Sequence, residues 1–489
     1  MAPIQSLNIF ERDLQTGDLD DEKLRQYHAA SLACGEAEHA SRVFAGLARR
    51  HPENITLRSL HIALCLQSQD EVQAMQSIEK LMADTGPSDG LLDAALSVRR
   101  RLPAEPSPPS GLSLCMIIRN EADRLARFLW MVKPLADEMV VVDTGSRDRS
   151  ADIARVFGAR VFSFEWCHDF SAARNYALSK VLGRWVLVLD ADEVIAPEDF
   201  DALRKLIAGN DDGKTAFSIR TRNYCNTANV IGWQANDGRY EGLEAGLGWF
   251  PSQKARLFPN SAEIRFRHPV HELVEPALRA GGFRILACDI PVHHYGHLNE
   301  AANQRKASAY FELGYAKLEQ MQEDTGALRE LAVQAGQLAR WPESIELWRR
   351  LLLRKPDFFE AHINLAGAHW QTGDYERALK SGYAAAAIAP DIKEAGFNIA
   401  VSLLMLGRTD EAANTLQKIT RKNPDYLPAL FMQAAAYCIL EDHSNARRLI
   451  GILNRKLPRA AVQMAQEDLA GRLAIAGRNT DAAKIKSMR

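Results

Sequence analysis

The stretch Trp185-Val186-Leu187-Val188-Leu189-Asp190-Ala191-Asp192-Glu193 places acidic residues directly after five consecutive apolar ones. A short, continuous apolar run is typical of a strand buried on both faces of a parallel sheet. Charge at the end of such a strand is costly unless water, a metal or a ligand satisfies it. Two carboxylates one residue apart at this position can serve a ribose and a divalent cation, and the cation in turn neutralises a diphosphate.

The residues before this stretch alternate between strand and helix patterns. Three further apolar runs predict strands, at residues 112–118, 139–142 and 160–162. Helical patterns separate the runs, over residues 125–132, 150–157 and 170–182. This alternation predicts a parallel sheet with right-handed crossovers, on which ligands bind beyond the carboxyl ends of the strands.

Polar residues follow two more of the predicted strands at the same edge. The first strand ends in Arg119-Asn120-Glu121 and the second in Asp143-Thr144-Gly145-Ser146. A single Asp at such a position is most often a helix N-cap or a turn residue. Acidic groups at three strand ends of one sheet edge favour a ligand site instead.

The C-terminal part of the chain repeats at a constant interval. The interval appears in one proline column and two alanine columns: Pro356, Pro390, Pro424 and Pro458; Ala366, Ala400 and Ala434; Ala378, Ala412 and Ala446. Small residues let paired helices approach closely, and proline ends the second helix of each unit. This pattern is the signature of tetratricopeptide repeats, whose period is about 34 residues.

The N-terminal part shows a weaker form of the same pattern. Ala40 and Ala74 are separated by the same interval, which predicts two degenerate repeats, with a plain helical bundle as the alternative. We therefore expect an N-terminal helical, degenerate tetratricopeptide-like region (1–103), a proline-rich linker (104–110), an α/β domain (111–300), a helical connector (301–325) and all-α C-terminal repeats (326–489).

Composition and charge exclude several classes of protein. The chain has 489 residues and a formal net charge of −2, so we expect two or three domains and no nucleic-acid partner. We expect no signal peptide within Met1 to Leu24, and no apolar stretch predicts a transmembrane segment. The seven cysteines are scattered and form no CxxC pair, which favours reduced thiols and a cytoplasmic location.

From Leu112 to about His297 the sequence resembles the inverting family 2 glycosyltransferases, which have the α/β GT-A (Rossmann-like) fold. The matching stretches are 117–121, 142–146, 169–175 and 190–193, and their order and spacing are far more specific than a lone Asp-x-Asp. With tetratricopeptide repeats on the same chain, the arrangement is similar to bacterial flagellin-modifying and sublancin-type protein and peptide glycosyltransferases.

This resemblance implies roles for the residues at the sheet edge. Asp143, assisted by Arg119-Asn120-Glu121, should contact the nucleobase or ribose of a UDP-sugar, and Asp190 should lie near the ribose. Asp192 should bind Mn²⁺ or Mg²⁺. Arg174 should approach the phosphates or brace the acidic loop, unless it is a surface arginine on its helix.

Two residues from the second half of the domain complete the implied site. Inverting transfer needs one base for the acceptor proton. Glu272, in His268-Pro269-Val270-His271-Glu272, occupies the place where relatives carry an acidic base; a surface Glu paired with Arg265 or Arg267 is the alternative. A neutral imidazole suits Mn²⁺, and His293 and His294 should face opposite sides of a strand. The resemblance favours His294 as the metal ligand, with a core or interface histidine as the alternative.

We therefore expect a metal-dependent glycosyltransferase that moves a hexosyl or N-acetylhexosaminyl group from a UDP-sugar to a hydroxyl or thiol of a protein acceptor, such as flagellin. The repeats should bind that acceptor on a polar concave face lined by His362, Asn364, His369, Asn398 and Gln433. The alternatives are a lipopolysaccharide-core transferase, a non-catalytic adaptor, and repeats that only form a homodimer. Zinc hydrolases and P-loop enzymes are not expected, because neither HExxH nor GxxxxGK[ST] occurs.

Overall fold

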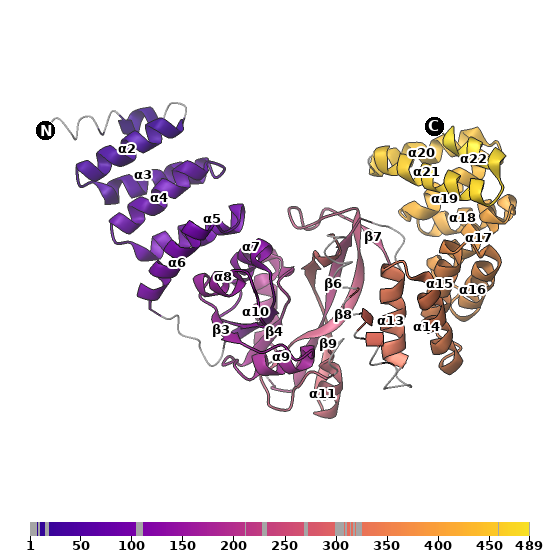
Figure 1. The fold of residues 1–489 in the computed structure, drawn as a ribbon, viewed down its shortest axis with the longest axis horizontal. Coiled ribbons are helices and arrows are strands. Elements are labelled where there is room, and N and C mark those ends of the chain that lie inside the picture. The colour runs from indigo at the N-terminus through magenta and orange to yellow at the C-terminus, as the bar shows by residue number, and fades with distance from the viewer. Residues whose placement is uncertain are drawn as a thin grey trace. The chain divides into compact units, whose positions relative to one another are not determined.

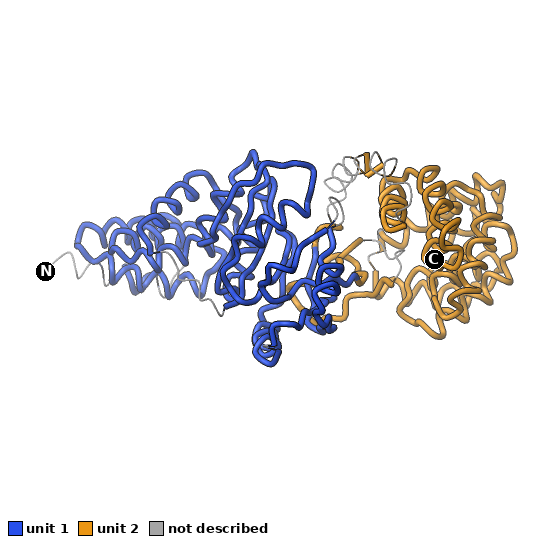
Figure 2. Tube along the Cα trace, turned by 90° about the horizontal axis from the view of Figure 1, so that it is seen from below, with its two compact units in different colours: residues 1–222, 252–294 blue, residues 223–251, 295–489 orange. Residues whose placement is uncertain are grey.

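The computed structural model describes residues 7, 10–14, 19–103, 111–210, 212–226, 232–267, 272–298, 308, 311, 312, 314, 315, 318, 325–457 and 459–488. The expected linker 104–110, the segment 268–271, most of the connector 301–325 and Pro458 lie outside these residues. Figure 1 labels the helices and strands. Packing divides the chain into two compact units, Met1–Arg222 with Ser252–His294 and Asn223–Pro251 with Tyr295–Arg489 (Figure 2).

The first unit begins with helices that keep the repeat period. They are α2 (Asp21–Ala33), α3 (Ala37–Arg50), α4 (Ile55–Gln67), α5 (Glu71–Thr85) and α6 (Asp89–Arg101). The pair α4 and α5 starts one repeat period after the pair α2 and α3. Ala40 and Ala74 are fully buried, and the turns at Gly35 (φ 74°) and Gln69 (φ 60°) are both left-handed. Two degenerate repeats describe this region better than a plain bundle.

A mixed sheet follows the N-terminal helices. Its elements are β1 (Leu112–Ile118), α7 (Ala122–Val132), β2 (Glu138–Asp143), α8 (Ser150–Val156), β3 (Arg160–Ser163), α9 (Phe170–Leu178), β4 (Trp185–Val188), β5 (Glu193–Ile195), η1 (Pro197–Asp199), α10 (Phe200–Ala208), β6 (Thr215–Cys225), β7 (Gln234–Ala235), β8 (Gly248–Pro259), α11 (Glu275–Ala280), β9 (Arg284–His294) and η2 (Gly296–Leu298). The strand order is β3-β2-β1-β4-β8-β6-β9-β5, with β7 on β8. The four predicted parallel strands are confirmed.

Helix α9 ends at Leu178, before the predicted end at residue 182. The N–H groups of Leu182 and Gly183 donate to the buried Glu138 carboxylate (2.9 and 3.3 Å) instead of to helical carbonyls. A Cβ at Gly183 would collide with the Ser113 hydroxyl. The chain therefore leaves the helix early to fit tightly beneath the strands.

The parallel register brings the predicted polar strand ends together. β1 lies between β2 and β4, and its partners include Ile118 with Asp143 and Cys115 with Val188. The carboxyl ends of all three strands therefore meet at one edge of the sheet. Apolar residues of α9, including Ala177, pack on the strand face that contains Val140 and Val186, so the core directly supports this edge.

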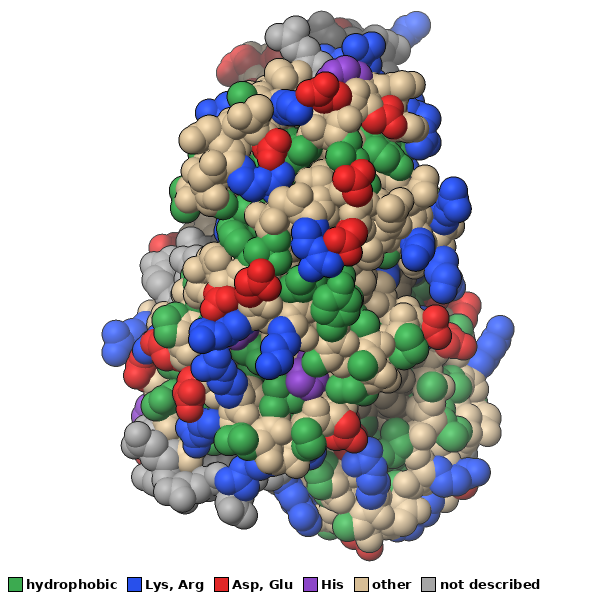
Figure 3. Space-filling view, turned by 90° about the vertical axis from the view of Figure 1, so that its right-hand side faces the viewer, with side chains coloured by type: hydrophobic (Ala, Val, Ile, Leu, Met, Phe, Trp, Pro, Cys, Tyr) green, Lys and Arg blue, Asp and Glu red, His purple; other side chains and the backbone are tan. Residues whose placement is uncertain are grey.

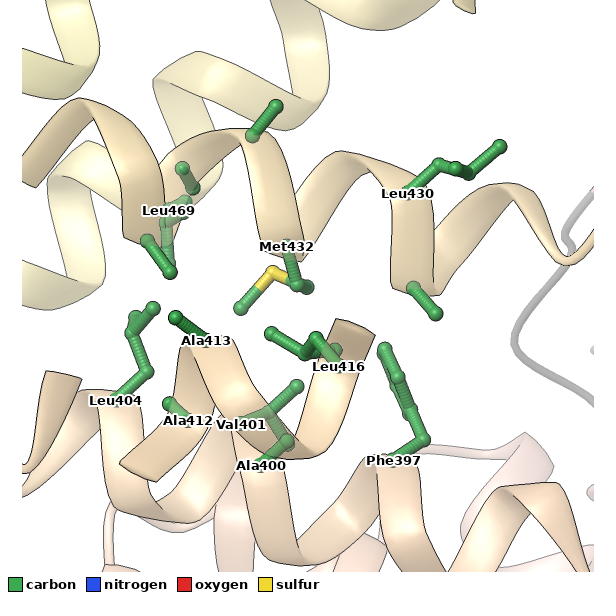
Figure 4. Close-up of a cluster of buried hydrophobic side chains, with 14 of the residues drawn as sticks. Phe397, Ala400, Val401, Leu404, Ala412, Ala413, Leu416, Leu430, Met432 and Leu469 are labelled. Atoms are coloured by element: carbon green, nitrogen blue, oxygen red, sulfur yellow. The ribbon is translucent and has the colours of Figure 1, made fainter. Parts of the chain in front are cut away.

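The second unit contains the C-terminal repeats. Its helices are α13 (Thr325–Gln337), α14 (Trp341–Arg354), α15 (Phe359–Gln371), α16 (Tyr375–Ile388), α17 (Lys393–Met405), α18 (Thr409–Lys422), α19 (Leu427–Ile439), α20 (His443–Lys456), α21 (Arg459–Ile475) and α22 (Asn479–Lys486). From α14 to α20, alternate helices start one repeat period apart. Both alanine columns are buried, and apolar side chains of α17, α18, α19 and α21 point toward one another (Figure 4).

The proline column ends helices in the expected way. Lys355, Ala389 and Asn423 each follow a second helix, precede a proline and have φ of −133°. A residue before proline is pushed out of the helical region by the proline ring. The predicted repeat mechanism is therefore visible in the backbone.

Described residues of the segment between β6 and β8 pack on the repeats of the second unit. Trp233 is 1% exposed and belongs to the same apolar cluster as Phe397 of α17. Glu394 accepts the Gly232 N–H (2.9 Å), and the Lys393 ammonium donates to the Trp233 carbonyl (3.3 Å). The repeats thus bind a segment of their own chain through α17.

The predicted polar lining of the repeats is wrong at two positions. His369 and Gln433 are only 4% and 3% exposed, because packing between neighbouring helices encloses them. The Gln433 side chain bonds with Thr420 (2.9 Å) and Tyr437 (3.2 Å).

The face drawn in Figure 3 mixes charged side chains of both signs with hydrophobic ones. Among the described residues, no helix has the length and apolar character needed to cross a membrane.

Candidate functional site

Two loops at the carboxyl ends of β1 and β2 are fastened to each other. The bonds are Asn120 N to Ser146 Oγ (3.0 Å), Glu121 N to Ser150 Oγ (2.7 Å), Ala122 N to Asp148 Oδ2 (3.1 Å) and Arg147 N to Asn120 Oδ1 (2.7 Å). Asn120 adopts a left-handed conformation (φ 56°), which Asn tolerates better than most residues. The loops therefore form one preorganised rim at the sheet edge.

Asp143 closes the second of these loops. Its Oδ1 accepts bonds from the Ser146 N–H (2.9 Å) and hydroxyl (2.6 Å), across the turn at Gly145 (φ 98°). From the neighbouring strand end, the exposed Arg119 guanidinium lies 6.0 Å from the centre of the Trp166 ring. A carboxylate near a planar cation and an aromatic ring can bind a flat ligand that offers hydrogen-bond donors.

The stretch 169–175 positions the acidic residues from α9. Asp169 caps the helix by accepting the Ala172 N–H (2.9 Å). One turn later, Arg174 donates from Nε to Glu272 Oε1 and from Nη2 to Asp190 Oδ1, both at 2.8 Å. Arg174 is 8% exposed, so the surface-arginine alternative is wrong.

Asn175, the next residue of α9, fixes the chain that leads toward Glu272. Its side chain donates to the Phe266 carbonyl (3.0 Å) and accepts the Phe266 N–H (2.8 Å). These two bonds hold the strand-like segment before residue 268 against the helix. Adjacent residues of α9 therefore contact the Glu272 side chain and the segment that ends before residue 268.

The bridging arginine also determines the ionisation of Asp190. Burial alone would raise the pKa of the Asp190 carboxyl, but Arg174, helped by Arg256, holds it well below its usual value. Burial opposes the charge on Arg174, yet Asp190 and Glu272 raise the pKa of its guanidinium above the usual range. Both groups stay charged at physiological pH.

Asp192 lies beside His294 because of the register between β5 and β9. Glu193 is paired with His294 across these strands, so the residue before Glu193 also reaches the imidazole. His294 Nε2 and Asp192 Oδ2 are 3.6 Å apart, and Arg124 Nη1 is 3.6 Å from the same oxygen. His293 is fully buried, and that burial lowers its pKa to about 4.

Asp192 and His294 influence each other's protonation. Burial opposes the charge of each group, but the attraction between the two groups lowers the pKa of the Asp192 carboxyl and raises the pKa of the His294 imidazole. The pair is therefore an electrostatically coupled acid and base at the sheet edge. Of the two histidines, His294 is the one that lies beside the acidic strand end.

The pair fits the implied divalent cation. Ligand atoms lie ~2.1 Å from a small divalent ion, so two of them can be at most about 4.2 Å apart, which the observed 3.6 Å satisfies. One carboxylate with one imidazole suits Mn²⁺ better than Mg²⁺. No group of three His, Cys, Asp or Glu side chains is placed to hold a metal in the described part of the chain. A bound diphosphate and water would add ligands to these two.

Comparison with known families agrees with this arrangement. Residues 113–269 match the model of glycosyl transferase family 2. Residues 329–391 and 373–437 match two tetratricopeptide repeat models. The chain carries a family 2 glycosyltransferase domain and tetratricopeptide repeats.

Three curated proteins illustrate the relationship. The chain is 39% identical over 201 residues to a TPR repeat-containing protein of Synechococcus elongatus, an overlap of 40% of this chain and 44% of that protein. It is 34% identical over 110 residues to an uncharacterized glycosyltransferase of Rickettsia typhi (22% and 37% covered). It is 25% identical over 205 residues to the SPbeta prophage-derived glycosyltransferase SunS of Bacillus subtilis (42% and 43%). The chain thus spans less than half the length of these relatives.

The glycosyltransferase domain brings the predicted residues into three adjoining groups. Asp143 lies with the loop 119–121, Asp190 and Glu272 share Arg174, and Asp192 lies with His294. Glu272 pairs with Arg174 instead of Arg265 or Arg267, the partners that the sequence suggested. The roles of these residues toward a substrate stay predictions.

One supporting pair of the glycosyltransferase domain was missed from the sequence. Glu193, 2% exposed, receives two bonds from the Arg256 guanidinium (2.6 and 2.5 Å), and its Oε2 also accepts the Asp190 N–H (3.0 Å). A buried carboxylate within Glu193-Val194-Ile195 requires a cation, which was the available signal. The partner could not be found because it lies on β8, 63 residues away.

Proposed function

We propose that this protein is a metal-dependent inverting glycosyltransferase that transfers a sugar from a UDP-sugar to a hydroxyl or thiol of a protein acceptor. The observation that carries the proposal is the gathering of acidic side chains at one edge of the sheet, two of which share a buried arginine. Asp190 and Glu272 converge on Arg174, and Asp192 lies at the same edge beside His294. Packing alone would not retain this many charges at one place.

The donor would bind across the preorganised rim. The loops around Asn120 and Asp143 offer a fixed set of carboxylate, amide and backbone groups to a nucleoside. Asp190, which follows β4 beside β1, would contact the ribose. Asp192 and His294 would hold Mn²⁺ or Mg²⁺, and the cation would stabilise the charge on the departing diphosphate.

Glu272 would accept the acceptor proton. In an inverting transfer, the acceptor oxygen or sulfur forms a bond to the anomeric carbon on the face opposite the diphosphate. The bond from that carbon to the diphosphate oxygen breaks, and UDP leaves with the electron pair. Arg174 orients Glu272 at 2.8 Å through its Nε, so the carboxylate is held in one position for this step.

The repeats would supply the binding surface for a protein acceptor. Tetratricopeptide arrays commonly present a surface to peptides or helices. His362 and Asn364 of α15 stay partly exposed, whereas His369 and Gln433 are excluded as contacts by burial. The seven cysteines of this chain are all free in the structure, as is typical of proteins in a reducing compartment. An acceptor that is modified in the cytoplasm, such as flagellin, fits this property.

A panel of nucleotide sugars with Mn²⁺ tests the proposal. The expected result is hydrolysis or transfer with one UDP-sugar, and loss of that activity in Asp192→Ala. Transfer to lipopolysaccharide core but not to protein would establish the alternative acceptor class. Absence of nucleotide binding and of turnover with every donor would favour a non-catalytic adaptor.

A further inference from the structure

Glu79 of α5 is a buried carboxylate that joins three helices. It is 2% exposed, and its Oε1 accepts bonds from Arg99 Nη2 (2.7 Å) and Lys133 Nζ (2.9 Å). Lys133 also donates to Oε2 (3.0 Å). Burying a carboxylate is costly unless it is well paired, and here both cations come from other elements. The contact is therefore specific to the way these helices meet.

Lys133 and Arg99 bind at the C-terminal ends of α7 and α8, the helices that follow the loops 119–122 and 143–150. Lys133 is the C-cap residue of α7. Arg99, on α6, donates from Nε to the carbonyl of Val156 (2.9 Å), the last residue of α8. Glu79 is thus linked to the C-terminal ends of both helices, directly through Lys133 of α7 and indirectly through Arg99, which bonds to α8.

The opposite ends of α7 and α8 carry the rim of the candidate donor site. Glu121 is the N-cap residue of α7, and Arg149 is the N-cap residue of α8. Arg149 also donates to Asp93 of α6 (2.7 Å), so the N-terminal region contacts both ends of α8. Because the loops are bonded to each other, a shift of either helix moves the whole rim.

Small tilts are enough to matter. Helix α7 has 11 residues and is about 16 Å long, so a tilt of ~5° about one end moves the other end by about 1.4 Å. A displacement of ~1 Å exceeds the spread of N–H···O hydrogen-bond distances, which is only about 2.7–3.2 Å, so it is enough to break contacts to a bound nucleotide. A helix fixed only by apolar packing against the sheet slides more easily than one held by charged bonds at its end.

We propose that Glu79 is a positioning residue for donor binding, and that the N-terminal repeats serve to hold α7 and α8 in place. This inference rests on the proposed function, because it needs the loops 119–122 and 143–150 to bind the nucleotide. Glu79 acts through Lys133 and Arg99 and touches no substrate. The N-terminal region then supports the donor site without contacting the substrate, and it is not an independent module.

The test compares two substitutions on the same helix of the full-length chain. Glu79→Gln removes the charge that holds α7 and α8. Glu71→Gln makes the same chemical change on α5, but Glu71 pairs with Arg101 of α6 and contacts neither helix through that bond. UDP binding with Mn²⁺ is measured by calorimetry, donor KM and kcat by kinetics, and folding by circular dichroism.

We expect Glu79→Gln to weaken UDP binding and raise the donor KM by about 5- to 50-fold with a smaller change in kcat, whereas Glu71→Gln stays within about twofold. Hydrogen exchange of residues 119–122 and 143–150 should accelerate in Glu79→Gln alone. If Glu79→Gln unfolds, Lys133→Met replaces it, because that partly exposed residue can be changed while Arg99 still pairs with Glu79.

The outcomes separate this inference from the proposed function. Equal UDP affinity and equal exchange in a folded Glu79→Gln and in Glu71→Gln would overturn the positioning role alone. Failure of the wild-type protein to bind UDP or any other nucleotide would overturn the proposed function and this inference together. A lower melting temperature with unchanged KM would show that Glu79 serves stability only.

Discussion

Replacing Arg174 by lysine should lower the local stability of α9 and of the acidic residues that follow β4. Arg174 serves Glu272 through Nε and Asp190 through Nη2, each at 2.8 Å. A lysine has one nitrogen on a flexible stem, and it cannot occupy both positions. At least one charge-assisted bond is therefore lost while the positive charge is kept.

The size of the effect follows from burial. A hydrogen bond to a charged group contributes ~1.5–3 kcal/mol when it is protected from water. The Asp190 side chain is 42% exposed, so water replaces part of the lost bond, and we expect a loss of about 1–2 kcal/mol in local stability. Such a loss corresponds to amide exchange that is about 5- to 30-fold faster.

Hydrogen exchange with mass spectrometry measures this change in the peptides that cover residues 170–178 and 185–193, without assuming two-state unfolding of a chain with several domains. The control is Arg155→Lys on α8, where an exposed arginine pairs with Asp152 (2.9 Å). That variant should change exchange by less than about twofold. If Arg174→Lys behaves like Arg155→Lys in these peptides, the bridging arginine does not stabilise the site.

Three further predictions follow from the site and from the repeats. Asp192→Ala, or excess chelator on the wild type, should lower turnover at least ~10²-fold because the cation stabilises the leaving group; full activity in chelator would remove the metal from the mechanism. Glu272→Gln should lower turnover by ~10²- to 10⁴-fold with UDP affinity nearly unchanged in calorimetry, and normal turnover would move the base elsewhere. Ala339 has φ of 54° at the turn position where the next repeat has Gly373 (φ 79°). Ala339→Gly should therefore stabilise helices α13 and α14 by about 1 kcal/mol, and Gly373→Ala should destabilise α15 and α16 by a similar amount, as measured by exchange in those helices; shifts of the same sign would contradict the assigned turn geometry.

Local patterns in the sequence predicted the fold well where the period of apolar or small residues decides it. The run 185–189 and the proline column each describe a local backbone state, a buried strand or a helix end, and the structure contains both. The parallel direction of β1 to β4 could be anticipated, because each of these strands follows the previous one through a helical crossover. The antiparallel strands β5, β8 and β9 pair over long separations that no local pattern specifies.

The candidate site could be predicted where local patterns decide it, and not where it depends on pairing between distant elements. Residues next to strand ends, such as Asp143 and Asp192, could be placed because their strands could be placed. The partners Arg256 and Arg124 could not, because a side-chain pairing depends on the packing of distant elements. Burial of His369 had the same origin, since helix faces become interior only when the neighbouring repeat is in place.

The seating of Trp233 on the repeats has a consequence for how such chains can recombine. Residues 223–251 leave the sheet at β6 and return at β8, yet their indole is enclosed by the α17 region, which comes much later in the sequence. A gene fusion or truncation that ends the chain near residue 300 would remove the repeats that bury Trp233. The indole and the apolar residues around it would then be exposed to water. A chimaera that takes its repeats from a relative should therefore fold only in two cases. Either the new repeats also cover Trp233, or the 223–251 segment of the relative is transferred with them. We therefore expect the segment and the repeats to be inherited together, although they are far apart in the sequence.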